Sequence, residues 1–558
     1  MAAPRLRTVQ QRTLPFLILA TAFAGTVWWQ IPLPSGFPGS QDTSATTVAV
    51  ADVLLAITGI AGLAAWARRD LSLALGPRAL HLAAALVLLA AALGAATAPN
   101  PGLARAWTLH LLLVWLLFAT IAAAPVAPWQ IAAALVAGLV VQAPIALEQV
   151  LRQTTSPDWL VLAWGADFRP NLQYASVLLE HDGTRWLRAY GPFFHPNILG
   201  GYVALELVLL VAIAALLARR GTSLKGWYAG GAAVGLAAGC LALSASRSAW
   251  LGAAVGVVAL AVGCHRWQVV QDCSVGWFRG RPPGIEAVGH SGDSVGAEDR
   301  PHSNTPLPWA ADARRGVWLY ALISPWARRL RMANSLDSGG PSPKPADPVA
   351  ERPVDRQPIV PHPGTGFRYA QLGRAVAAAC LVTAAILLAT RPPLLERFNP
   401  NSNALEQQSV QERAFTLDMG WQLFRAHPIL GVGAGNIDYA EVAFYKGQYA
   451  PIPVHSVPLL MAVELGPLGI VAWAVAAFTI VWQTWRQPCP WTIAFAGALI
   501  AAGVAGLFDH YFWSIPTAQT TLAVLAGGWA ASIRRGPGGA VGTRGRPVEH
   551  GAATALQP

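Results

Sequence analysis

Long apolar runs, separated by short polar and basic stretches, recur along most of this chain. A helix needs roughly 20 mostly apolar residues to cross the hydrocarbon core of a bilayer. Runs of that length predict about twelve membrane-spanning helices. They are expected at residues 14–31, 48–67, 79–97, 105–124, 129–147, 195–218, 227–245, 248–264, 373–390, 456–485, 490–508 and 514–533. The pattern therefore predicts an all-α, polytopic integral membrane protein.

The short connections give an orientation. If the spans alternate, one side of the membrane receives most of the basic residues that flank them. These are Arg5, Arg7, Arg12, Arg68, Arg69, Arg78, Arg219, Arg220, Lys225, Arg486, Arg534 and Arg535. The positive-inside rule makes that side the cytoplasm, so both termini are predicted to be cytoplasmic. Ala22-Phe23-Ala24 resembles a signal-peptide cleavage site. We favour an uncleaved anchor, because the apolar run continues through Trp28 and Trp29.

Three long connections predict the domain organisation. Residues 1–264 contain the first eight helices and an outer loop at 148–194, and residues 373–535 contain the last four helices and an outer loop at 391–454. Between them, residues 265–372 form a cytoplasmic insert rich in Pro, Gly, Ser and Arg, a composition typical of disorder. Within it, residues 316–333 are predicted to form an interfacial helix. Residues 536–558 are predicted to be a disordered cytoplasmic tail.

Composition agrees with this picture. Only 12% of the residues are charged, against about 25% in a typical soluble domain. The formal net charge of +11 does not indicate a nucleic-acid-binding protein, because the basic residues lie between apolar runs. The cysteines form neither a disulfide framework nor a CxxC metal motif. They are Cys240, Cys264, Cys273, Cys380 and Cys489.

The two outer loops contain arginines where positive charge is disfavoured. They are Arg152, Arg169, Arg185 and Arg188 in the first loop, with Arg391, Arg397, Arg413, Arg425 and Lys446 in the second. Arginine binds phosphate through bidentate, charge-assisted hydrogen bonds. Any single arginine is better interpreted as a partner of lipid headgroups or of Glu396, Glu412 or Asp418. The set as a whole favours a pocket for an anionic ligand held at the membrane.

The second outer loop contains a predicted helix. Its apolar positions recur at alternating steps of four and three, which forms one stripe. They are Val410, Ala414, Leu417, Trp421 and Phe424. Arg413 lies on the flank of this stripe, and His427-Pro428 ends the helix. The glycine run that begins at Gly431 is better interpreted as a tight turn than as a phosphate-binding loop.

Several ionisable residues are functional candidates. Pro451 and Pro453 precede His455, which would then lie at the outer membrane boundary and can take a proton from a hydroxyl. Taken alone, His455 is more often an interfacial polar residue. Intramembrane carboxylates are candidates by default, although protonation or a bond to a neighbouring helix explains them equally well. They are Glu206, Glu464 and, with its neighbour His510, Asp509. Glu180-His181-Asp182 is only a weak metal candidate, and no metal site is assigned.

An ordered set of motifs over residues 185–485 resembles the O-antigen ligase and polymerase family of bacterial membrane glycosyltransferases. The motifs are Arg188 with Gly191 and His195-Pro196-Asn197, then Ser246-Arg247-Ser248, then Arg413 with Pro428 to Gly433, and finally His455-Ser456 followed by Glu464 to Gly469. The family commonly has Asn after the histidine, whereas this chain has Ser456. The insert at 265–372 is also longer than expected for the family.

The resemblance implies transfer of a glycan from a polyprenyl-diphosphate-linked donor to an acceptor hydroxyl at the outer face of the bacterial inner membrane. It implies no cofactor and no metal. Arg188 and Arg413 would bind the diphosphate, Arg247 would assist them, and His455 would be the catalytic base. Asn197, Glu464 and Glu206 are possible supporting residues. The implied partners are the lipid-linked donor, a glycan, lipid or protein acceptor, and the bilayer.

Alternative functions remain open at this point. A repeat-unit polymerase and a protein O-oligosaccharyltransferase use the same chemistry as a ligase. A secondary transporter of small anions would suit twelve spans and Glu206, but transporters usually place polar residues near the midplane of repeated halves. This chain has no visible repeat, and its polar density lies in two outer loops. A purely structural membrane anchor would leave the external arginines unexplained.

Overall fold

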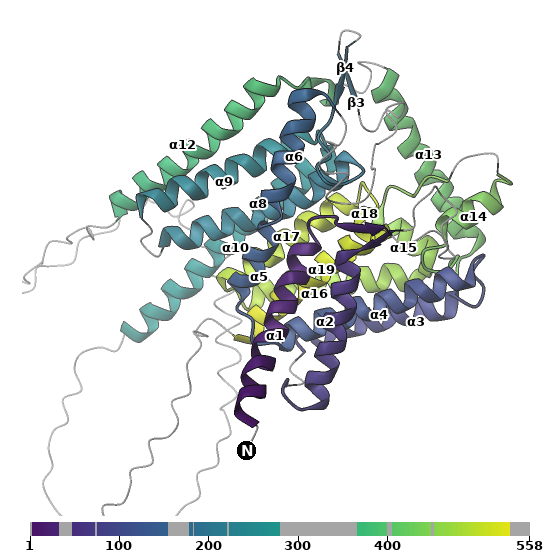
Figure 1. Ribbon diagram of the computed structural model, residues 1–558, viewed down its shortest axis with the longest axis horizontal. Helices are drawn as coiled ribbons and strands as arrows, with labels where there is room; N and C mark the ends of the chain where they lie inside the picture. Colours follow the sequence, from purple (N-terminus) through teal and green to yellow (C-terminus); the bar gives the residue numbers. More distant parts are fainter. Residues whose placement is uncertain are drawn as a thin grey trace, which may run out of the picture. The chain divides into compact units, whose positions relative to one another are not determined.

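The computed structural model describes residues 3–32, 47–72, 75–154, 178–181, 184–219, 223–279, 365–398, 404–447 and 451–535. All of them belong to one unit, formed by Met1–Arg279 together with Pro363–Pro558 (Figure 1). The predicted interfacial helix at 316–333, most of the predicted insert and the tail at 536–558 lie outside the described residues.

Helices make up most of the described chain. The first nine described helices are α1 (Ala3–Ala24), α2 (Val50–Ala67), α3 (Arg78–Gly94), α4 (Pro101–Ala123), α5 (Pro128–Val136), α6 (Leu139–Arg152), α8 (Pro196–Arg219), α9 (Leu224–Leu243) and α10 (Arg247–Arg279). The later ones are α12 (Thr365–Thr390), the short 3-10 helix η1 (Leu394–Phe398), α13 (Ala404–Ala426), α14 (Ile437–Phe444), α15 (Val457–Leu465), α16 (Pro467–Arg486), α17 (Pro490–Gly506), α18 (Tyr511–Ser514) and α19 (Pro516–Arg535).

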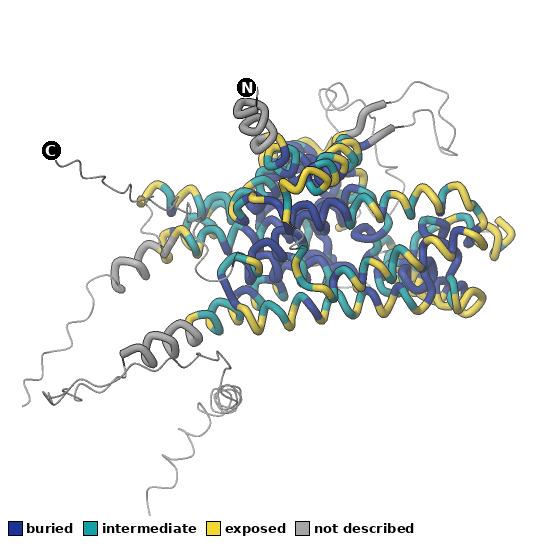
Figure 2. Tube along the Cα trace, turned by 90° about the horizontal axis from the view of Figure 1, so that it is seen from below, coloured by how far each residue is buried: buried dark blue, intermediate teal, exposed yellow. Residues whose placement is uncertain are grey.

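The prediction of a polytopic, all-α membrane protein is confirmed. Among the described residues, 8 helical segments are long and apolar enough to cross a membrane, and Thr13–Ala24, Arg78–Gly94 and Pro490–Gly506 are shorter apolar helices. Each of the twelve predicted spans coincides with helix. Large apolar side chains such as Ile60, Leu381 and Leu388 are exposed, as expected where lipid is the solvent. Figure 2 shows exposed positions recurring along the outer helices, around a buried interior.

Two predicted spans are broken helices. The run at 129–147 is divided between α5 and α6, and the run at 456–485 is divided between α15 and α16. The second break falls at Gly466, whose φ of 68° is accessible to glycine at little cost, and Pro467 then starts α16. The first span also differs from the prediction, because α1 ends at Ala24 and does not include Trp28.

The boundaries of the predicted insert differ in the same way. Residues 265–372 were expected to be largely disordered, but α10 continues through Arg279 and α12 begins at Thr365. The polar and basic residues that ended the apolar run near position 264 therefore did not end the helix. A hydrophobic pattern marks where a helix meets lipid, and helical backbone can continue beyond that point.

Small residues allow close contact between the helices that carry the site. Gly252 and Gly256 of α10 face α17, where a Cβ at Gly252 would lie 2.6 Å from the carbonyl oxygen of Ala501. Gly235 of α9 faces α12 in the same way, with 2.5 Å to the carbonyl oxygen of Ala379. Such contacts let backbones approach closely, which is how membrane helices gain packing energy without a hydrophobic driving force.

Two short antiparallel hairpins complete the described structure. Strand β1 (Gln30–Pro32) pairs with β2 (Thr47–Ala49), and β3 (Leu178–His181) pairs with β4 (Thr184–Leu187). Strand β4 leads directly to Arg188, and Leu187 and Tyr190 are buried against Leu405 near the start of α13. The second hairpin thus connects the two outer loops.

Candidate active site

Arg188 is at the centre of a buried polar network. Its side chain is only 2% exposed, although it follows a surface hairpin. The guanidinium Nε donates to the carbonyl oxygen of Ser244 at 2.9 Å, and Nη2 donates to the carbonyl oxygen of Ala245 at 3.2 Å. These carbonyls belong to the turn between α9 and α10, in which Ala245 has a φ of 48°. Arg188 therefore fixes the turn from which Arg247 starts α10.

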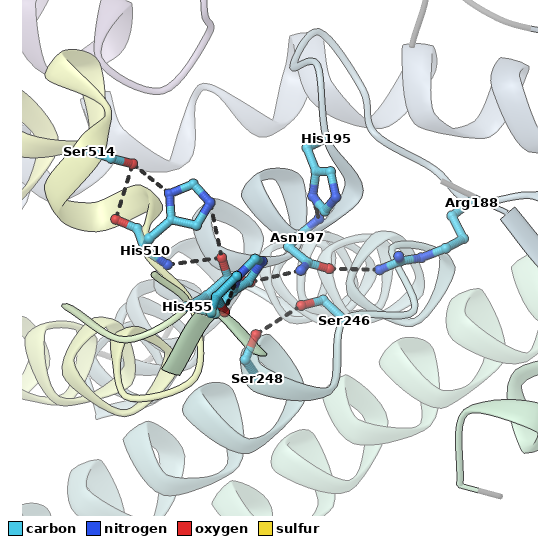
Figure 3. Close-up of polar contacts among 10 residues, drawn as sticks. Arg188, His195, Asn197, Ser246, Ser248, His455, His510 and Ser514 are labelled. Atoms are coloured by element: carbon cyan, nitrogen blue, oxygen red, sulfur yellow. Dashed lines mark hydrogen bonds and ion pairs between the residues drawn. The ribbon is translucent and has the colours of Figure 1, made fainter. Parts of the chain in front are cut away.

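Asn197 connects Arg188 to the far end of the chain. Its Oδ1 accepts a hydrogen bond from Arg188 Nη2 at 2.8 Å, and its Nδ2 donates to Asp509 Oδ2 at 2.7 Å (Figure 3). All three side chains are buried. The other carboxylate oxygen of Asp509 accepts the backbone N–H of His510 at 2.9 Å. The network therefore joins the start of α8 to the connection between α17 and α18.

Two histidines lie beside this carboxylate. The rings of His455 and His510 are arranged edge to face, with centroids 5.2 Å apart. His510 Nδ1 lies 2.6 Å from Ser514 Oγ (Figure 3). His455 Nδ1 lies 3.4 Å from Thr416 Oγ1 on α13. His455 comes just before α15, and α18 follows His510. Two segments that are distant in sequence thus place two imidazoles and a carboxylate together.

Four arginines lie close to one another beside this centre, because Arg247, Arg397 and Arg413 all interact electrostatically with Arg188. Glu406 of α13 forms an ion pair with the buried Arg397 and another with Arg247, whose Nη1 lies 3.4 Å from Glu406 Oε2. Arg247 also donates to the carbonyl oxygen of Arg397 at 3.0 Å. Arg413 is half-buried and forms no ion pair among the residues the structure describes. Glu406 thus neutralises one of the four positive charges, and Arg413 keeps its charge available to a ligand.

Helix α13 positions Arg413. It ends at Ala426, next to His427-Pro428, as predicted. Its buried face consists of Glu406, Thr416, Met419, Gly420 and Leu423. The predicted apolar stripe lies on the other side: Leu417 is 41% exposed and Trp421 is 44% exposed. Arg413 is on the boundary between the two faces, as expected for a helix that lies on a membrane surface.

The glycine run after α13 is a tight turn, as predicted. Gly431, Gly433 and Gly435 all have positive φ values. The N–H of Val432 donates to the carbonyl oxygen of Val463 at 2.8 Å, and the N–H of Gly433 donates to that of Glu464 at 3.0 Å. These N–H groups therefore bind the end of α15. The turn fixes α15 relative to α13, so it is not a phosphate-binding loop.

Electrostatics separate the roles of the charged groups. Burial lowers the pKa of His455, and Arg413 lowers it further, while Asp509 raises it. Burial also lowers the pKa of His510, to about 4. Burial alone would raise the pKa of Asp509, but His510, His455 and His195 outweigh that effect and lower it. At neutral pH the site therefore contains an ionised carboxylate beside a neutral imidazole that can accept a proton.

The side chains of His455, Asp509 and His510 are also close enough to be metal ligands. One ligand atom from each lies within 4.8 Å of the others. The weaker candidate from the sequence, Glu180-His181-Asp182, includes Asp182, which lies outside the described residues. His181 Nδ1 instead lies 2.8 Å from Glu396 Oε1.

A comparison of the sequence with protein-family models gives a match, and it includes part of this site. Residues 364–474 match the family model described as O-antigen ligase. The chain carries an O-antigen ligase family domain. The resemblance inferred from the ordered motifs is therefore confirmed over residues 364–474, which contain the motifs around Arg413 and His455. A comparison with curated protein sequences gives no match.

The O-antigen ligase domain supplies only part of the candidate site. It includes Arg413, His455 and Glu406. Arg188 and Asp509 lie outside the matched residues and reach the same centre through the fold. The membrane-spanning helices before and after this domain are therefore part of the site, and the domain alone does not contain the complete network.

Other sequence candidates lie in the scaffold. Glu464 is buried in α15, and its Oε2 accepts the indole N–H of Trp513 at 2.8 Å, which ties α15 to α18. Glu206 is buried within α8, and its Oε1 accepts a hydrogen bond from Gln142 Nε2 at 2.9 Å. Gln142 is on α6. Glu464 therefore braces the site, while Glu206 joins two helices at another level of the bundle.

Sequence reasoning underestimated two groups. Arg397 appeared only as one of several outer arginines, and Asp509 only as one of several intramembrane carboxylates. The structure places Arg397 against Glu406 and Asp509 against Asn197. Asp509-His510 directly after an apolar run was the one local signal for the second group.

Proposed function

We propose that this protein transfers a glycan from a polyprenyl-diphosphate-linked donor to an acceptor hydroxyl at the outer face of a bacterial inner membrane. The main support is that Arg188 and Arg413 lie beside His455 and Asp509 in a chain that carries an O-antigen ligase domain. The orientation rests on the positive-inside rule and places both termini in the cytoplasm. A ligase transferring to a lipid-linked core is the first choice, and a polymerase or oligosaccharyltransferase is the alternative.

The donor diphosphate would bind at Arg413 and Arg247. These side chains are less buried than Arg188 and Arg397, and so are better placed for direct contact with a ligand. Arg188 would act without direct contact to the diphosphate. It fixes the turn that carries Arg247, and it adds positive charge to the site. The polyprenyl tail would extend into the bilayer beside the exposed apolar side of α13, where Trp421 lies.

The reaction would proceed in one displacement. The acceptor hydroxyl oxygen forms a bond to the anomeric carbon, and the bond from that carbon to the diphosphate oxygen breaks. His455 takes the hydroxyl proton, and the polyprenyl diphosphate leaves with the electron pair. Asp509 stabilises the imidazolium that forms, since the carboxylate raises the pKa of His455. The arginines stabilise the negative charge of the leaving group, which is already a good one.

In this mechanism the guanidinium groups neutralise the charge of the departing diphosphate. We therefore propose that the reaction needs no resident metal, and that His455 and Asp509 move and stabilise a proton. Asn197 would couple the two halves of the site, because one amide bonds both the donor-side Arg188 and the acceptor-side Asp509.

Lipid analysis of a deletion strain tests the function. Loss of the protein should lead to accumulation of undecaprenyl-linked glycan, and re-expression should remove it. Purified protein should then transfer glycan from that lipid to an acceptor in vitro. Altered uptake of a small anion, with no change in lipid-linked glycan, would instead favour the transporter alternative.

A further inference from the structure

A cavity of about 600 Å³, lined in part by polar side chains, lies at the ends of α3, α16 and α19 that are remote from the candidate active site. Its lining residues are Leu75, Gly76, Pro77, Arg78, His81, Gln483, Gln487, Ile533 and Arg534.

The helices place this cavity far from the candidate active site. The opposite end of α3 lies at the glycine turn, where a Cβ on Gly94 would be 3.2 Å from Gly433 Cα. α19 begins just after α18. Helices of 17 to 20 residues are roughly 25–30 Å long. The cavity is therefore at the other boundary of the membrane.

The charge of this cavity comes from two arginines. No carboxylate is among its described lining residues, which include Arg78 and Arg534. His81 adds no charge. The indole N–H of Trp115 can only donate, so His81 Nδ1 accepts it at 3.1 Å, and His81 Nε2 then donates to the carbonyl oxygen of Leu75 at 3.0 Å. Two positive charges thus line a cavity whose other polar side chains are His81, Gln483 and Gln487.

The backbone around both arginines is fixed. Arg534 Nη2 donates to the carbonyl oxygen of Ala124 at 3.2 Å, which ties the end of α19 to the end of α4. Gly76 has a φ of 89°, and a Cβ there would lie 2.9 Å from Ala530 Cβ. The turn that carries Arg78 therefore packs tightly on α19. Arg78 itself forms no ion pair with any residue the structure describes. A fixed backbone beneath both arginines reduces the conformational freedom that is lost when they bind an anion.

An apolar groove adjoins the cavity. Gln483 lines both spaces, and the groove of about 380 Å³ continues along α3 and α16 past Ala79, Phe478 and Trp482. The rings of Phe478 and Trp482 are stacked, with centroids 5.9 Å apart, and both are exposed. A free inorganic anion would use only the cavity. A ligand with a phosphate and a hydrocarbon chain would use both.

We propose that this cavity is a binding site for an anionic phospholipid. Its phosphate would lie between Arg78 and Arg534, with Gln483 and Gln487 as further donors. One acyl chain would lie in the groove along Phe478. The arginines match the charge, and the membrane boundary supplies the ligand, because phosphate oxygens and acyl chains meet at that depth. This proposal is independent of the proposed transfer reaction.

Binding can be measured on the full-length protein in an uncharged detergent. Phosphatidylglycerol should bind by native mass spectrometry and raise the thermal unfolding temperature, whereas phosphatidylcholine with the same acyl chains should do much less. Arg78→Gln and Arg534→Gln should each weaken phosphatidylglycerol binding about tenfold, since each removes a charge-assisted contact. Lys225→Gln is the matched control: Lys225 is exposed at the start of α9, does not line the cavity, and loses the same charge.

Two further arms separate the possible outcomes. Inorganic phosphate should not raise the unfolding temperature, and equal stabilisation by phosphate would overturn the proposal in favour of a simple anion site. Phe478→Ser should weaken binding of phosphatidylglycerol while leaving both arginines in place. Equal binding of the two phospholipids by the natural protein would also overturn the proposal. Should an arginine variant fold poorly, the comparison of the two lipids and Phe478→Ser still decide the question.

Discussion

Gly420 of α13 packs against Val454, the residue before His455. A Cβ built on Gly420 would lie 2.7 Å from Val454 Cγ2 and 3.1 Å from its Cγ1. This contact sets the distance between the helix that carries Arg413 and the segment that carries His455. We expect Gly420→Ala to push the two apart and to reduce glycan transfer at least tenfold, because catalysis depends on the positions of both groups. In vitro transfer by purified variants measures this effect.

The matched experiment adds Val454→Ala to Gly420→Ala. The smaller side chain at 454 makes room for the new methyl group, so the double variant should recover much of the lost rate. A double-mutant cycle measures this coupling directly. Recovery would be absent if Gly420 acted only through the stability of α13, since Val454→Ala alone removes buried apolar surface.

Local patterns in the sequence were sufficient to predict where most helices lie. Runs of apolar residues located each spanning segment, and His427-Pro428 correctly marked the end of α13. The breaks were harder, because Gly466 breaks an apolar run whose hydropathy does not change. Hydropathy indicates whether a segment contacts lipid or water. Whether the helix breaks within that segment depends on the backbone dihedral φ of a single residue.

The site was predictable in part. The family motifs pointed to Arg188, Arg413 and His455, and the structure brings these segments to one centre, although their roles remain proposals. The bond between Asn197 and Asp509 joins residues far apart in sequence. No periodicity reports such a contact, because it depends on how whole helices pack. The exposed stripe of α13 was visible in the sequence, but which neighbour its other face contacts was not.

Arg413→Lys and His455→Ala should affect different parameters. Lysine keeps the charge of Arg413 but loses the planar fork, so donor affinity and rate should fall ten- to a hundredfold, equivalent to about 1.5–3 kcal/mol. His455→Ala should remove turnover and leave donor binding, because the base acts on the acceptor. Transfer kinetics and lipid-donor binding on purified protein measure both.

Arg105→Lys on α4 is the control for Arg413. Arg105 is exposed, and its Nε donates to the carbonyl oxygen of Pro101 on the same helix at 3.1 Å, so its replacement should leave transfer nearly unchanged. Near-normal rates in both Arg413→Lys and His455→Ala would refute the proposed site. Loss of donor binding in His455→Ala would refute its role as base but not its location.

Sidedness of the chain gives a separate prediction. In a cysteine-free background, a cysteine at Leu395, which is 82% exposed in η1, should react with a membrane-impermeant reagent on intact cells. A cysteine at Lys225, exposed at the start of α9, should react only after the membrane is opened. Labelling of Lys225→Cys from outside would reverse the proposed orientation.

Metal dependence can be tested directly. Treatment with a chelator such as EDTA, followed by its removal, should leave the transfer rate unchanged if the arginines neutralise the leaving group. Added Zn²⁺ should inhibit transfer, because His455, Asp509 and His510 offer nitrogen and oxygen atoms within 4.8 Å of one another, and a bound ion would occupy the base. Loss of activity on chelation, restored by a divalent ion, would show that the reaction needs a metal.

The pH dependence of transfer tests the pairing of Asp509 with His455. The base must be neutral to accept a proton, so the rate should fall on the acid side as His455 becomes protonated. Burial and Arg413 lower the pKa of His455, which places this acid limb below the ordinary pKa of histidine, 6.5. Asp509 opposes that shift and raises the pKa of His455. In Asp509→Asn the limb should therefore move to still lower pH, while the plateau rate falls because the imidazolium loses its partner.

Asp418→Asn is the control for this prediction. It alters a carboxylate on the exposed side of α13 that accepts a hydrogen bond from Gln422, so it should leave both the acid limb and the plateau rate unchanged. If Asp509→Asn lowers the plateau without moving the limb, the carboxylate supports the fold but does not act on the base.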